Sequence, residues 1–506
     1  MFYKLNNEVT AAVKQYIQTS WKVLLRSHHH LLQAVSDPKM PQNKAKIIYV
    51  SATENLEAIR SQLQTALQPT DYQQLILQRL PNKVLTVKEH GLLYLPHPYI
   101  VPGGRFNEMY GWDSFFILLG LLHNEEIQLA QAMVANAVYQ VEHYGKILNA
   151  NRTYQLDRSH PPLLTQMILA VYHKIQDKAW LTNQLTAIHK FYQFWISPPH
   201  KINGCDLSRY YAISNQPAPE VIYSELDQHG RDHYQRVKAY YSTHKIHAYS
   251  LRKFYNKESN ELYPAFYQGD RSARESGFDP SSKYGPFGAA ITSFAPVCLN
   301  TLLYKMEQDI ATIYHILQKS SMSEEWLMLA DRRAKSINQH CWDHDLGYYF
   351  DYHVKKQRTR PYIFATTFYP LWAGIASKEQ AQRVVQNLAA LEAPGGLLAS
   401  AYMTGNQWDA PFGWAPLHYF AIKGLARYGY IKTAKRLAYK FIKVINHEFF
   451  RCGAIFEKYD VCKISAKVQH TLQFGYVSNE VGFGWTNGVY LELLDFLSKV
   501  PARDRL

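Results

Sequence analysis

Residues 161–175 read PPLLTQMILAVYHKI, and residues 181–196 read LTNQLTAIHKFYQFWI. In both stretches apolar residues recur at three- and four-residue spacing, which is the period of an amphipathic helix. Two such helices joined by a short connection favour an antiparallel pair. These residues therefore predict a helical hairpin.

The same pattern recurs along the chain. Further pairs of helical stretches occupy residues 295–317 with 324–342 and residues 413–429 with 431–450. Alternating, strand-like patterns are few and short, and the best candidates are KVLTV (83–87) and LGYYFDYH (346–353). No GxGxxG or P-loop string indicates a nucleotide-binding sheet. Helical pairs from about residue 113 onward, joined by segments rich in Gly, Pro, Asp and Trp, predict an all-α ring of hairpins with chemistry in its loops.

The 506 residues contain no Pro/Gly/Ser-rich linker, charge block or low-complexity tract. Because 47% of the residues are hydrophobic, the chain can bury a sizeable core. We expect one domain over residues 1–506, with a helical N-terminal segment, residues 1–90, packed on it.

The formal net charge is +14, which is compatible with a nucleic-acid or acidic partner. The basic residues are scattered, with no Lys/Arg run of five or more, so we interpret the charge as a solvated basic surface. We predict no nucleic-acid partner, and strongly salt-dependent DNA binding would be needed to revive one. A phosphate or carboxylate on the substrate stays open.

Five cysteines, odd in number and irregular in spacing, form no zinc pattern or disulfide framework and suggest free thiols in a reducing compartment. His28, His29 and His30 point in different directions on a helix, and no other histidines show ligand spacing, so we predict no metal and no cofactor. The N-terminus lacks an apolar stretch typical of a signal peptide, and no window approaches a membrane span. The predicted location is cytoplasmic, with no membrane partner.

The first candidate site is the loop VPGGRFNEMYGWDSFFILLGLL (101–122). An arginine, a carboxylate and three rings crowd before an apolar helix, at Arg105, Phe106, Tyr110, Trp112 and Asp113. Rings suit the apolar faces of a pyranose, and the charged groups suit its hydroxyls. The alternative is a capped helix start, with Asp113 or Ser114 as the N-cap.

Two strings resemble the signatures of the trehalase family of glycoside hydrolases: PGGRFNEMYGWDSF (102–115) and GNQWDAPFGWAP (405–416). The resemblance continues in NANRTYQLDRSHPP (149–162), RESGFDPSS (274–282), APGGLLAS (393–400), EKYDV (457–461) and NEVGFGWTNGV (479–489). It implies an (α/α)6 toroid of six hairpins with the active site at one mouth. That agrees with the helical pattern.

The resemblance also implies an inverting hydrolase that uses two carboxyl groups. Asp279 matches the general acid and Glu480 the general base. In an inverting enzyme the two carboxyls stand roughly 6.5–9.5 Å apart, with a water beside the base. The alternative for either carboxylate is a helix cap or an ion pair.

Sugar-binding positions carry over from the family in the same way, onto Arg105, Phe106, Trp112, Asp113, Asn149, Arg158, Glu220 and Trp408. Tyr110, His160 and Gly277 lie beside these residues and complete the predicted site. Two of these assignments have alternatives. Arg158 could form a surface ion pair, and Trp408 with Asp409 could pin a loop rather than face sugar.

The chain departs from the family at the predicted leaving-group side. His160 replaces a glutamine, Ala218 an arginine and Phe278 a tryptophan, and QHTLQFGYVSNE (469–480) replaces a glycine-rich segment. Alanine cannot supply an arginine's paired donors. We therefore lean slightly toward glucosylglycerol or glucosylglycerate as substrate, with trehalose as the alternative. A catalytically inactive sugar-binding protein is the third reading. The oligomeric state stays open, and a monomer is possible.

Overall fold

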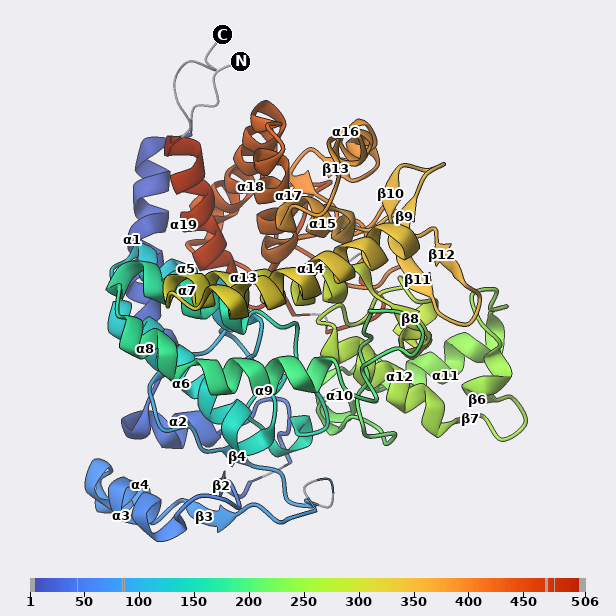
Figure 1. Cartoon of the computed structure of the whole chain (residues 1–506). Helices are drawn as coiled ribbons and strands as arrows, with labels where there is room; N and C mark the ends of the chain where they lie inside the picture. The colour runs from blue at the N-terminus through green and yellow to red at the C-terminus, as the bar shows by residue number, and fades with distance from the viewer. Residues whose placement is uncertain are drawn as a thin grey trace.

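The computed structural model describes residues 5–42, 44–83, 85, 87–468, 472–476 and 478–499. Helices dominate these residues, and the strands are two to four residues long (Figure 1).

The inner helices form a closed ring. Each packs on the next in the order α5 (Asp113–His123), α7 (Leu164–Ile175), α13 (Val297–Ile316), α15 (Tyr369–Ala373), α17 (Ala415–Arg427) and α19 (Gly484–Lys499), and α19 packs back on α5. Helix α5 reads DSFFILLGLLH and is buried at nearly every position. A helix that is apolar on all sides needs neighbours on all sides, and the ring supplies them.

A second layer of helices covers the ring. It consists of α6 (Ile127–Tyr144) on α5 and α7, α9 (Leu185–Trp195) on α6 and α13, α14 (Ser320–Cys341) along α13, α16 (Lys378–Gln386) after α15, α18 (Ile431–Cys452) on α17 and α19, and α1 (Asn7–Leu24) on α18 and α19. Figure 1 shows α1 and α19 side by side. Within the described residues, six inner and six outer helices thus form the (α/α)6 toroid, which confirms the predicted fold class.

The N-terminal segment differs from the helical expectation. Helix α1 belongs to the ring, and the chain after it forms a three-stranded parallel sheet in the order β3 (Ile76–Arg79), β2 (Ile47–Val50) and β4 (Leu92–Leu93). Helix α3 (Leu56–Ala66) connects β2 to β3. All four residues of β2 are buried. A strand buried on both faces reads as a continuous apolar run, so the period-two signal was absent and the helical expectation was wrong here.

The other two strand predictions have different outcomes. LGYYFDYH is confirmed as β10 (Tyr348–Tyr349) and β11 (Asp351–His353). KVLTV includes Val84 and Thr86, which lie outside the described residues.

The remaining elements are short and sit between the ring helices. The helices are α2 (Leu31–Val35), α4 (Pro69–Tyr72), α8 (Lys178–Asn183), α10 (Pro219–Ser224), α11 (His233–Thr243) and α12 (Pro264–Glu275). The strands are β1 (Leu25–Arg26), β5 (Tyr99–Ile100), β6 (Tyr255–Asn256), β7 (Glu261–Leu262), β8 (Phe294–Ala295), β9 (Trp342–Asp343), β12 (Arg358–Arg360), β13 (Glu392–Ala393), β14 (Gly396–Leu397), β15 (Phe412–Trp414) and β16 (Lys458–Asp460). Strands β15 and β16 pair antiparallel, which brings the GNQWD and EKYDV strings together.

One hydrophobic cluster runs from Val13 on α1 to Leu493 on α19, so the ring shares a single core. The five cysteines are all free. Among the described helices, none combines the length and the apolar character needed to cross a membrane.

The contact between α5 and α19 generates a stability prediction. A Cβ on Gly488 would stand 1.8 Å from the carbonyl oxygen of Phe116, a backbone atom that cannot turn away. We expect Gly488→Ala to lower the free energy of unfolding by about 3 kcal/mol, as overpacking does. Ser498→Ala, on the exposed end of α19, is the control and should change it by less than about 0.5 kcal/mol. Denaturant unfolding measures both, and equal stability of the two variants would contradict the close packing.

Candidate active site

A cavity with about 700 Å³ of empty space opens where the loops ahead of α5 and α19 meet the loop that follows α12. It is lined by every predicted sugar-site residue and by the predicted acid: Arg105, Phe106, Tyr110, Trp112, Asp113, Asn149, Arg158, His160, Glu220, Gly277, Trp408 and Asp279. Glu480, the predicted base, is not among the lining residues. All the predicted site residues except Glu480 therefore lie on the cavity.

Aromatic rings form one wall of the cavity. Trp408 stacks on Trp414 with ring centroids 3.9 Å apart and lies 5.9 Å from Trp112. Gly277 has φ +77°, and a Cβ there would stand 2.9 Å from the Trp112 ring. A glycine is needed at this position because the backbone is left-handed and the ring lies against it. Trp408 therefore fits both of its predicted roles. It packs against other rings of the wall, as a loop-pinning residue would, and it also faces the cavity, as a sugar-binding residue would.

Arg158 and Glu220 form the polar wall. Arg158 is 1% exposed and pairs with Glu220 and with Asp157, so its alternative as a surface ion pair is wrong. Among the described residues, five buried atoms of cavity-lining side chains make no hydrogen bond to the protein: Arg158 Nε, Glu220 Oε2, Glu225 Oε2, Gln155 Oε1 and Gln407 Oε1. Buried polar atoms in native proteins nearly always have partners. A ligand with several hydroxyl groups would provide them.

His160 adds a donor to the same cavity. Its Nδ1 accepts a hydrogen bond from the backbone N–H of Trp112 at 3.2 Å, which leaves the proton on Nε2. Burial, with a contribution from Arg158, holds the pKa of His160 well below its ordinary value. The imidazole is therefore neutral and presents one N–H. Asn149 stands beside it and donates to the carbonyl of Arg274 at 3.0 Å.

Asp113 is the first residue of α5, and its side chain faces the cavity. The capping alternative is wrong, because Trp112 occupies the N-cap position and Ser114 donates instead to the carbonyl of Tyr110 at 2.6 Å. Burial raises the pKa of Asp113 well above its ordinary value, and the nearby carboxyls of Glu457 and Asp279 add to this. Three acidic groups thus lie close to one another around the cavity.

Asp279 holds a proton near neutral pH. Burial raises the pKa of its carboxyl to about 7; Arg274, whose Nη1 lies 3.1 Å from Oδ2, opposes the shift, and Glu225 adds to it. The side chain remains 28% exposed and lines the cavity. A reachable carboxyl with this pKa can donate a proton to a bound molecule.

Two other carboxylates in the quoted strings hold the fold around the site. Glu275 is fully buried and accepts hydrogen bonds from the backbone N–H groups of Ser159 and Tyr211 at 2.8 and 2.6 Å. Asp409 is also fully buried and accepts hydrogen bonds from four donors: the N–H of Ser282 and the hydroxyls of Ser281, Thr404 and Tyr362. Asp409 does not line the cavity and instead pins the segment after Asp279, as in the alternative in which it holds a loop.

Glu480 faces the protein backbone. Its Oε2 accepts the N–H of Arg105 at 2.8 Å, and its Oε1 accepts the hydroxyl of Ser478 at 2.5 Å. A Cβ on Gly104 would stand 1.9 Å from Oε2, so the loop lies directly against the carboxylate. Glu480 therefore orders the Arg105 loop.

Glu457, the first residue of the EKYDV string, lines the cavity although no role was predicted for it. It is 2% exposed, pairs with Lys458 at 2.8 Å and accepts the hydroxyl of Tyr476. Burial raises its pKa, Lys458 opposes the shift, and Glu480 adds to it. Glu457 directly precedes β16, and its charge contributes to the raised pKa of Asp113 at the start of α5.

Other lining residues were missed as well. Arg274, Gln155 and Gln407 all lie inside strings that carry the family resemblance, so those strings were the signal. Glu225 lies outside every quoted string, and nothing in the sequence singles it out.

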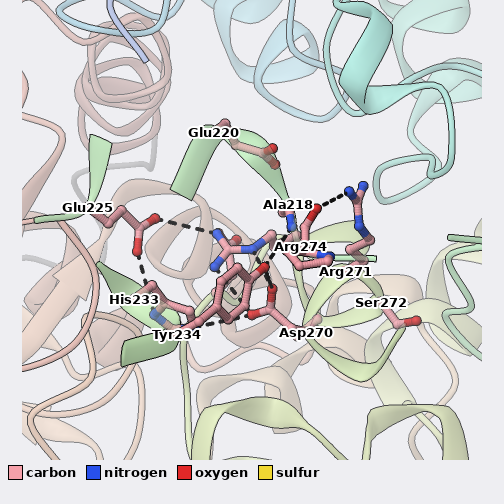
Figure 2. Close-up of polar contacts among 12 residues, drawn as sticks. Ala218, Glu220, Glu225, His233, Tyr234, Asp270, Arg271, Ser272 and Arg274 are labelled. Atoms are coloured by element: carbon pink, nitrogen blue, oxygen red, sulfur yellow. Dashed lines mark hydrogen bonds and ion pairs between the residues drawn. The ribbon is translucent and has the colours of Figure 1, made fainter. Parts of the chain in front are cut away.

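The predicted departures from the family lie only partly on the cavity. Ala218 is fully buried, does not line it, and donates its N–H to the hydroxyl of Tyr234 at 2.8 Å (Figure 2). In the segment QHTLQFGYVSNE, Tyr476 lines the cavity, whereas residues 469–471 and 477 lie outside the described residues.

The chain is similar to known proteins along most of its length. The Trehalase family model matches residues 3–498. The cytosolic neutral trehalase of Kluyveromyces lactis is 36% identical over 80% of this chain, and the periplasmic trehalase of Citrobacter koseri is 34% identical over 81%. The chain spans 57% and 70% of these two relatives' lengths.

Among solved structures, the neutral trehalase Nth1 of Saccharomyces cerevisiae matches with a TM-score of 0.80 at 32% identity. The match covers 98% of this chain and 95% of that one. The fold is thus shared along nearly the whole chain.

Proposed function

Because the chain belongs to the trehalase family, we propose that it is an inverting glycoside hydrolase and that its substrate is trehalose. The observation that carries this proposal is the cavity: it joins a carboxyl that is protonated near neutral pH to an aromatic wall and to buried polar atoms without partners. An α-glucoside supplies the scissile oxygen, the ring faces and the hydroxyls that these groups require. By analogy with relatives named cytosolic, we propose a cytoplasmic location.

The choice of trehalose over glucosylglycerol or glucosylglycerate follows from two considerations. The preference for a smaller leaving group rested on Ala218 together with His160, and Ala218 is not on the cavity wall. The relatives that share a third of the residues are named trehalases. His160 remains as a difference on the wall, and it still donates one hydrogen bond to the cavity.

In the proposed reaction, Asp279 donates its proton to the glycosidic oxygen as the bond to the anomeric carbon breaks. A water molecule attacks that carbon from the opposite face, and a carboxylate base takes the water's proton. We assign the base to Glu457, because Glu457 lines the cavity and Glu480 faces the backbone of Gly104 and Arg105. Glu480 remains the assignment that the sequence alone favoured.

Variants separate the two candidate bases. We expect Asp279→Asn and Glu457→Gln each to lower kcat by about 10²–10⁴-fold, since each removes a proton-transfer group. Glu480→Gln should cost less and act mainly through the Arg105 loop. Steady-state kinetics on the best substrate measures this, with circular dichroism as the check on folding. A Glu480→Gln loss as large as that of Asp279→Asn, together with a near-normal Glu457→Gln, would return the base to Glu480.

The substrate and the stereochemistry are tested together. Trehalose, glucosylglycerol and glucosylglycerate are offered side by side, and proton NMR follows the released glucose during the first minutes. We expect trehalose to give the highest kcat/KM and each cleavage of trehalose to yield one β-glucose with one α-glucose, because water attacks opposite the leaving group. A higher kcat/KM for glucosylglycerol or glucosylglycerate would contradict the proposal that trehalose is the substrate. Exclusive α-glucose would overturn inversion, and no cleavage at all would leave a sugar-binding protein.

A further inference from the structure

Arg274 stands at the centre of a buried cluster that reaches the cavity wall (Figure 2). Its Nε and Nη2 lie 3.3 Å from the two carboxylate oxygens of Asp270, one turn earlier on α12. Its Nη1 points to two other carboxyls, Asp279 at 3.1 Å and Glu225 at 3.5 Å. One guanidinium nitrogen is therefore shared between the proposed acid and a glutamate from the loop after α10.

Glu225 is held where it can share this nitrogen. It is 4% exposed, and its backbone carbonyl accepts a hydrogen bond from Arg236 at 2.8 Å. His233, fully buried at the start of α11, lies 3.7 Å from Glu225 Oε2 and 3.4 Å from Asp270 Oδ1. Figure 2 shows these contacts as a closed ring of side chains.

Asp270 is fixed from its other side as well. It accepts the hydroxyl of Tyr234 at 2.9 Å, and Tyr234 in turn accepts the N–H of Ala218. Arg274 holds the pKa of Asp270 low in spite of burial, so Asp270 is ionised and keeps two of the guanidinium's nitrogens occupied. Arg274 can reach Asp279 only through Nη1.

We propose that Glu225 is a positioning residue for the acid: it shares Arg274 Nη1 with Asp279 and so prevents Arg274 from pairing fully with the acid. This inference rests on the proposed function. An arginine that paired with Asp279 alone would favour the ionised form of its carboxyl, and an ionised carboxyl cannot donate a proton. A second carboxylate on the same nitrogen offsets that effect. The cavity thus keeps an arginine beside the acid without losing the proton.

Several charged groups near Asp279 affect its pKa together with Glu225. They are Arg274, Arg158, Asp270 and Asp113. Glu225 can be neutralised without disturbing the residues that pair with Arg158, which are Glu220 and Asp157. A change at Glu225 therefore reports on the shared guanidinium.

The test is the pH profile of kcat/KM for Glu225→Gln, which removes the charge and keeps the shape. Asp279 should then pair more fully with Arg274 and lose its proton at lower pH. Because the acid works only while protonated, the alkaline limb should move down by about one pH unit. At a pH above the alkaline limbs of both enzymes, kcat/KM of the variant should be about tenfold lower than that of the wild type. At a pH below both alkaline limbs, the two values should differ little.

Two controls separate this role from a structural one. Glu225→Asp keeps the charge and should leave the alkaline limb closer to that of the wild type than Glu225→Gln does. Glu307→Gln removes a carboxylate from another buried pair, with Arg333, away from the cavity. It should lower stability without moving the limb.

The outcomes are distinguishable. A folded Glu225→Gln enzyme with an unmoved alkaline limb overturns the inference, as does a rise in KM of equal size at every pH, which would make Glu225 a substrate contact. If Glu225→Gln does not fold, Glu225→Ala replaces it, and failure of both to fold assigns Glu225 to stability alone. A wild-type enzyme that cleaves no α-glucoside overturns the proposed function instead.

Discussion

Helices α5 and α19 meet backbone to backbone at Gly120 and Gly488, and this contact closes the ring. An added Cβ on Gly120 would stand 2.8 Å from the Cα of Gly488 and from the ring of Trp21. The loops that precede the two helices are thereby brought together, with the N–H of Gly484 on the carbonyl of Pro102 at 2.7 Å. The carboxylate of Glu480 and the N–H of Arg105 meet just beside this point. The cavity wall is therefore a consequence of how closely two helices can approach.

The cavity tolerates many buried charges because most of them are paired. Arg158 with Glu220, Lys458 with Glu457 and Arg274 with Asp270 each place opposite charges within hydrogen-bond distance. A buried charge without such a partner would be strongly unfavourable. Burial raises the pKa of Asp113, Asp279 and Glu457, although Arg274 opposes the shift at Asp279 and Lys458 opposes it at Glu457. Arginines instead hold the pKa of Glu220 and Asp270 low in spite of burial, so these two carboxylates stay ionised in their pairs.

The sequence predicted the toroid because helical periodicity is local and recurs in each hairpin. Most of the cavity residues were predicted from the resemblance to the trehalase family, because the strings that carry this resemblance gather there. Prediction from the sequence failed where the deciding contact is tertiary. Nothing local separates Glu457 from Glu480, since only the fold turns one toward the cavity and the other toward Gly104. The strand β2 was missed because a fully buried strand carries no alternation.

Helix α1 is the outer partner of the last inner helix, although it comes first in the chain. Trp21 on α1 donates its indole N–H to Asn124 at 2.8 Å and packs beside α5, while the rest of the same helix lies on α18 and α19. The contacts with α18 and α19 join residues separated by most of the sequence, and loop-closure entropy makes such long-range contacts late events in folding. During synthesis the apolar face of α1 stays uncovered until α19, against which it packs, has left the ribosome. The nascent ring is therefore exposed to aggregation until its final helix arrives.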